Sequence, residues 1–137
     1  NSNLIFENFK KFKLPKVGEL LKISHKKTNK TIIICQGADV LNEILKIKKE
    51  IDLLGSVSIF SGVWLNEINK KDLLKLNNKK VIMFQSSIDY GSFDSFLSKK
   101  VLENSIKIKK FKSISINEIP KCGQNDEEGV VNTFYGN

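Results

Sequence analysis

The sequence predicts an α/β domain built on a parallel sheet, and residues 31–60 carry most of that prediction. Residues 31–35 form a β-branched run without a polar break, which is typical of a strand buried on both faces. After a turn at residues 36–39, apolar residues recur at helical spacing on one stripe, formed by Val40, Ile44, Ile47, Ile51 and Leu54. Residues 57–60 then resume the extended pattern. A strand, a helix and a second strand in this order begin a parallel sheet with a right-handed crossover.

The remaining elements continue this alternation along the chain. Strands are predicted over residues 19–24, 79–84 and 106–116, and helices over residues 70–76, 92–104 and from 125 onward. The first of these strands alternates only weakly, which favours a sheet edge. Asn69 is a favourable N-cap for the helix that follows it, and Gly55 ends the single helix predicted over residues 40–54.

The length of the chain fits one domain. The sequence has 137 residues, enough to bury a substantial core. We expect this domain to span residues 18–137. Residues 1–17 contain several apolar side chains and are predicted to be a linker or packing arm from a preceding domain.

The charge of the chain is strongly positive, with a formal net charge of +8. All of its basic residues are lysines, and no arginine is present. Proteins that read nucleic acids specifically rely on the planar, bidentate guanidinium of arginine. We therefore expect no specific nucleic-acid partner, although non-specific attraction to polyanions is an open alternative that predicts salt-dependent retention on heparin.

The cysteines and the hydropathy of the chain indicate its setting. Cys35 falls inside the most apolar strand, Cys122 lies in a distant loop, and no CxxC motif joins them. We therefore expect a reducing, cytoplasmic environment. No window reaches the roughly 18 apolar residues of a membrane span, so no membrane partner is predicted.

Motifs for catalysis, metal binding and nucleotide binding are missing from the sequence. His25 is the only histidine and lies in a lysine-rich turn, where an exposed side chain is favoured over a catalytic base. The turn at residues 36–39 has one glycine, whereas a dinucleotide-binding loop has three at set spacing. Neither Ser61 nor Ser86 stands in a GxSxG elbow. We predict no catalytic residue and no metal ligand in this chain.

A ligand crevice is nevertheless predicted where the ends of the parallel strands diverge. The candidate lining residues are Gly37, Ser61, Gly62, Trp64, Gln85 and Ser86. Trp64 either flanks this crevice or packs into the core. One hypothesis is therefore that the chain is a free-standing, doubly wound domain that binds a small ligand or has a regulatory role.

Four stretches, at residues 30–40, 57–69, 81–93 and 119–136, follow one another in the order and spacing of a known family. Together they resemble the C-terminal domain of transketolase-like thiamine diphosphate enzymes. This family includes transketolase, deoxyxylulose-phosphate synthase and the beta subunits of 2-oxoacid dehydrogenases, and the resemblance does not select among them. The chain departs from the family pattern at Gln85-Ser86, where the family has an acidic pair.

The resemblance implies a three-layer α/β/α fold with a mostly parallel five-stranded sheet and one antiparallel edge. It also implies a non-catalytic domain that supports the dimer or regulates an enzyme transferring two-carbon ketol units between sugar phosphates. Thiamine diphosphate and Mg²⁺ are then expected on the preceding domains, in the same or a separate chain, and none is expected on this one. The expected assembly is a homodimer.

Overall fold

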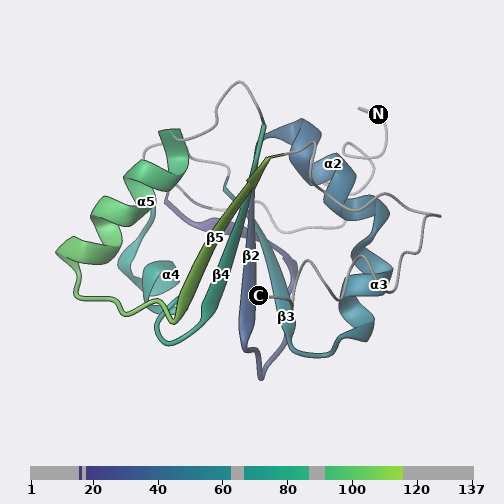
Figure 1. Cartoon of the computed structure of the whole chain (residues 1–137), viewed down its shortest axis with the longest axis horizontal. Coiled ribbons are helices and arrows are strands. Elements are labelled where there is room, and N and C mark those ends of the chain that lie inside the picture. Colours follow the sequence, from purple (N-terminus) through teal and green to yellow (C-terminus); the bar gives the residue numbers. More distant parts are fainter. Residues whose placement is uncertain (1–15, 17, 63–66, 87–91, 116–137) are drawn as a thin grey trace.

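The computed structural model describes residue 16 and residues 18–62, 67–86 and 92–115 (Figure 1). Most of the predicted arm at residues 1–17 lies outside the described residues. The same holds for Trp64, for Cys122 and for the helix predicted from residue 125 onward.

A five-stranded sheet forms the centre of the fold. Its strands are β1 (Leu20–Ser24), β2 (Thr31–Gln36), β3 (Val57–Gly62), β4 (Lys80–Gln85) and β5 (Lys110–Ser115). Their order across the sheet is β1-β3-β2-β4-β5. Strand β1 runs antiparallel to β3, and the other neighbouring pairs are parallel. The predicted α/β fold with a mostly parallel sheet is therefore confirmed.

Helices cover both faces of this sheet (Figure 1). Helices α2 (Ala38–Lys46) and α3 (Lys48–Leu53) pack on one face, and α4 (Lys70–Leu74) and α5 (Ser92–Glu103) pack on the other. The central strands are buried on both sides, since Ile33 contributes to the first core and Ile34 to the second. The arrangement is compatible with a three-layer α/β/α fold. Among the described residues, no helix is long and apolar enough to cross a membrane.

The prediction of one helix over residues 40–54 is wrong, because the helix is interrupted at Ile47. The backbone of Ile47 turns to φ −111°, and its N–H bonds to the carbonyl of Ile44 in a tighter turn. Asp52 then fixes the second helix, because its carboxylate accepts hydrogen bonds from Ser24 at 2.7 Å and Lys48 at 2.7 Å. The hydrogen bond from Ser24 joins α3 to the end of β1.

The strand predicted over residues 106–116 is shorter in the structure, since β5 begins only at Lys110. The N–H of Ile106 bonds to the carbonyl of Val101 and closes helix α5, so this N–H does not take part in the sheet. Ile106 and Ile108 instead pack into the core beneath α5.

Candidate functional site

The predicted crevice residues gather at the carboxyl ends of the parallel strands. The register pairs Gln36 of β2 with Gly62 of β3 on one side and with Gln85 of β4 on the other. Gly37, Ser61 and Ser86 adjoin these positions. Five of the six predicted residues therefore lie together where the parallel strands end, which we call the carboxyl edge of the sheet. The chain leaves β2 toward β3, and leaves β4 in the opposite direction toward β5, which makes this edge a topological switch point. Ligand binding there stays a prediction.

Two buried glutamine side chains stand out at this edge. Gln36 is 4% exposed, Gln85 is fully buried, and the Oε1 atom of each has no hydrogen-bond partner within the part of the chain that the structure describes. Both side chains face the α4 and α5 side of the sheet, because Ile34 and Met83, two residues earlier, pack into that core. The Nε2 of Gln85 donates to the Oγ of Ser113 at 2.9 Å. Two neighbouring amide oxygens without a described partner thus lie at this end of the sheet.

Cys35 lies beside this edge, but its thiol is not suited to nucleophilic chemistry. Cys35 is fully buried in β2, and burial raises the pKa of its thiol far above the usual range. The thiolate is the reactive form of cysteine, so Cys35 behaves as a small apolar core residue. Among the described residues, no group of three or more His, Cys, Asp and Glu side chains is placed to hold a metal ion.

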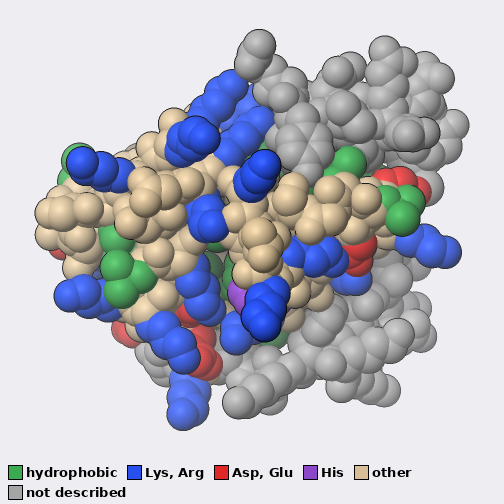
Figure 2. Space-filling model, turned by 90° about the horizontal axis from the view of Figure 1, so that it is seen from below, with side chains coloured by type: hydrophobic (Ala, Val, Ile, Leu, Met, Phe, Trp, Pro, Cys, Tyr) green, Lys and Arg blue, Asp and Glu red, His purple; other side chains and the backbone are tan. Residues whose placement is uncertain are grey.

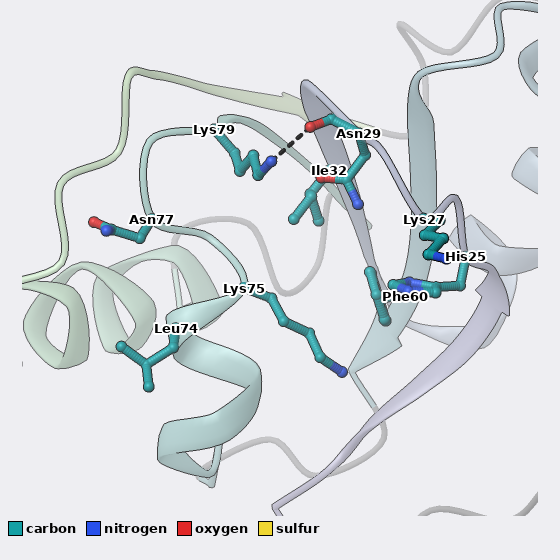
Figure 3. Close-up of a pocket in the computed structure, with 9 residues that line it drawn as sticks. All are labelled: His25, Lys27, Asn29, Ile32, Phe60, Leu74, Lys75, Asn77 and Lys79. Carbon is teal, nitrogen blue, oxygen red and sulfur yellow. Dashed lines mark hydrogen bonds between the residues drawn. The ribbon is translucent and has the colours of Figure 1, made fainter.

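A second site lies at the opposite end of the sheet, where the parallel strands begin. A cavity of about 230 Å³ opens there, which we call the amino-edge cavity (Figure 3). Its described walls come from the β1–β2 connection and from the segment joining α4 to β4, and Ile32 and Phe60 of the sheet form its floor. The lining residues are His25, Lys27, Asn29, Ile32, Phe60, Leu74, Lys75, Asn77 and Lys79. Figure 2 shows lysine side chains gathered around the single histidine on this face.

The ring of Phe60 organises the cavity. The His25 ring stands edge-on to it, with centroids 6.1 Å apart, and the Nζ of Lys75 lies 5.3 Å from the Phe60 centroid. Asp72 holds Lys75 in this position through an ion pair of 2.7 Å. Across the cavity, the Nζ of Lys79 donates to the backbone carbonyl of Asn29 at 2.6 Å.

His25 is exposed, as the sequence predicts, and its surroundings disfavour the protonated ring. Partial removal from water lowers the pKa of His25 below 6.5, and the charges of Lys22 and Lys75 lower this pKa further. We therefore expect Lys22→Gln to raise the pKa of His25, measured from its ring signals in an NMR pH titration. Glu103→Gln, a charge change on α5, serves as the control and should leave that pKa unchanged.

The lowered pKa of His25 also determines how the free energy of unfolding changes with pH. Because the folded pKa lies below 6.5, the unfolded chain takes up the proton first as the pH falls. His25 therefore destabilises the fold as the pH drops below about 6.5 and has no such effect above it. A Lys22→Gln variant that leaves the pKa of His25 unchanged would contradict this account.

Sequence reasoning missed the amino-edge cavity. The lysine-rich turn around His25 shows no sequence pattern that connects it with Lys75 or Lys79. The available signal was the concentration of lysines at the amino ends of two predicted strands, β2 and β4, which neighbour each other in the sheet.

No known family model matches this chain, and no curated protein sequence matches it either. The sequence resemblance and the geometry above are therefore the observations that bear on function.

Proposed function

We propose that this chain is the non-catalytic C-terminal domain of a transketolase-like thiamine diphosphate enzyme. The observation that carries the proposal is the sheet, which is five-stranded and parallel except for the single antiparallel edge strand β1. This is the arrangement that the family resemblance implies. Three of the four resembling stretches also coincide with consecutive parallel strands, β2, β3 and β4.

In this role the domain supports a homodimer or regulates the enzyme in the cytoplasm. The parent enzyme transfers two-carbon ketol units between sugar phosphates. Thiamine diphosphate and Mg²⁺ bind on the preceding domains, which belong to the same polypeptide or to a separate one. The proposal rests on likeness of sequence pattern and fold, and such likeness supports a family more strongly than it supports a particular substrate.

Reconstitution of the enzyme tests the proposal. The reading frame that precedes Asn1, or an adjacent one, is expected to encode a GDG motif followed by a later Asn, which is typical of thiamine diphosphate sites. That polypeptide should show ketol transfer only when residues 18–137 are present, and its dimer should weaken without them. Tight binding of thiamine diphosphate and Mg²⁺ by this chain alone, or ketol transfer by this chain alone, would count against the proposal.

A second candidate function is favoured by the Oε1 atoms of Gln36 and Gln85, which have no hydrogen-bond partner among the residues placed by the structure. In this alternative the chain is a small-ligand-binding domain whose crevice includes Gln36 and Gln85. A buried amide oxygen without a partner destabilises the free protein, and a ligand that donates hydrogen bonds would relieve that cost. A tryptophan fluorescence screen against phosphosugars tests this function, and a saturable response in the isolated chain would support it.

The ligand-binding alternative predicts that Gln36→Met stabilises the free protein. The change removes a buried amide oxygen that has no partner among the described residues and keeps a similar volume, so the free energy of unfolding should rise by about 1 kcal/mol in urea denaturation. Gln85→Met is the matched control. It also removes the hydrogen bond to Ser113, so we expect little net change. A clear loss of stability in Gln36→Met would mean that this side chain has a structural role instead.

A further inference from the structure

The amino-edge cavity carries an excess of positive charge. Its described lining residues include three lysines and one histidine and no carboxylate. Asp72 offsets Lys75, but Lys27 and Lys79 have no ion pair among the described residues. Lys22 adds a further charge, because it pairs with Phe60 across β1 and β3 and so faces the same side of the sheet. A concave site lined by one sign of charge concentrates its field on a counter-ion.

The cationic groups come from separate elements, and Lys75 and Lys79 are held in place. Lys75 projects from the end of α4 toward the Phe60 ring and is fixed there by Asp72 (Figure 3). Lys79 approaches from the segment before β4 and is anchored to the carbonyl of Asn29. His25 and Lys27 lie together on the opposite side, beside Phe60 (Figure 3). Donors that are already oriented lose little side-chain entropy when an anion binds.

The size of the cavity limits the ligand. A volume of about 230 Å³ is below the roughly 300–1,000 Å³ of pockets that hold drug-sized molecules. A compact anion with several oxygens matches both this volume and the separate lysine ammonium groups, each of which acts as a point charge. Phosphate is the compact biological anion with these properties.

We propose that the amino-edge cavity binds a phosphoryl group, either as inorganic phosphate or as part of a small phosphomonoester. Lys27, Lys75 and Lys79 would bind its oxygens, with His25 at the rim. This site lies at the opposite edge of the sheet from the predicted crevice and does not depend on the transketolase-like assignment.

Phosphate titration of the isolated 137-residue chain tests the proposal. At low ionic strength, where screening is weak, inorganic phosphate should shift the NMR ring signals of His25 in a saturable way. Calorimetry with inorganic phosphate and with glycerol 3-phosphate then distinguishes free phosphate from a phosphomonoester as the ligand. The one that the site is built for should bind more tightly. Saturable binding of either one supports the site.

Charge-removing variants show whether binding is local. Lys27→Gln and Lys79→Gln should each weaken phosphate binding by about tenfold, the order expected for one lost charge-assisted hydrogen bond. Lys27 is exposed, so its variant should fold normally even if Lys79→Gln does not. Lys49→Gln is the matched control, because Lys49 is an exposed lysine on α3, against the other face of the sheet. It should retain binding within about twofold, since it removes only a distant, screened charge.

Two results would overturn the proposal. The first is an absence of saturable shifts in the His25 signals when phosphate is added. The second is an equal weakening of phosphate binding in Lys27→Gln and Lys49→Gln, which would indicate diffuse attraction to the net charge of the chain. Neither result bears on ketol transfer, so failure of this proposal is distinguishable from failure of the proposed function.

Discussion

Replacing Asp72 with alanine should lower the free energy of unfolding by about 3 kcal/mol, because a buried carboxylate with two partners is lost. Asp72 is only 4% exposed. One of its oxygens accepts a hydrogen bond from the backbone N–H of Leu20 at 2.8 Å, and the other binds the ammonium of Lys75 at 2.7 Å. Alanine leaves a buried N–H unpaired at the start of β1 and leaves the Lys75 charge uncompensated beside Phe60.

Urea denaturation measures this loss, and two further variants separate its causes. Asp72→Asn keeps an acceptor for Leu20 and removes the charge, so it should be destabilised by about 1–2 kcal/mol. Glu103→Gln is the control, because that exposed carboxylate makes only long ion pairs of 3.9 and 4.0 Å and should change stability by less than about 0.5 kcal/mol. A loss below about 1 kcal/mol in Asp72→Ala would show that β1 is held by other contacts.

Asp72 also links the fold to the phosphate site proposed above. Through Leu20 it ties the antiparallel edge strand to α4, and through Lys75 it positions one wall of the amino-edge cavity. Asn69 supports this link, because its side chain caps α4 by accepting a hydrogen bond from the N–H of Asp72 at 2.8 Å. One carboxylate thus joins a structural contact to the charge arrangement of the cavity.

The strands were predictable because their signals are local. The β-branched run at residues 31–35 and the apolar run at residues 81–84 are each buried on both faces, as their composition indicates. The break at Ile47 was hidden, because Ile47 continues the apolar stripe and is buried whether or not the helix is interrupted. Ile106 and Ile108 alternate with lysine as a half-buried strand does, but the N–H of Ile106 bonds to the carbonyl of Val101 and β5 begins only at Lys110.

The two candidate sites also differ in how far local sequence signals predict them. The carboxyl-edge residues follow directly from strand ends, which sequence patterns locate, so their gathering along one edge could be predicted, while the ligand crevice itself stays a prediction. The amino-edge cavity depends on a contact between residues 50 positions apart, such as that of Lys79 with Asn29. That contact exists only once β2 and β4 pair in the register that places Thr31 beside Lys80. Local patterns locate the lysines at the amino ends of the two strands, but they do not give the register that brings Lys79 to Asn29.

Replacing Gly37 with alanine should destabilise the protein by about 2–3 kcal/mol, because this position combines a restricted backbone with a steric conflict. Gly37 turns the chain from β2 into α2 with φ +106° and ψ 146°, a conformation that side chains strongly disfavour. An added Cβ would lie 2.9 Å from the Oδ1 of Asp39. That oxygen also accepts a hydrogen bond from the N–H of Val40 at 2.9 Å, which resists its displacement.

Gly55→Ala is the matched control for Gly37→Ala. Its φ is +79°, and an added Cβ would meet no atom within 4 Å, so only the backbone cost of about 1 kcal/mol is expected. In urea denaturation, the double variant Gly37→Ala/Asp39→Ala should recover the steric part of the loss and retain the backbone part. Equal losses in Gly37→Ala and Gly55→Ala would show that the turn adjusts freely. Gly37 would then be replaceable, and the crevice edge that it borders would not depend on a fixed turn.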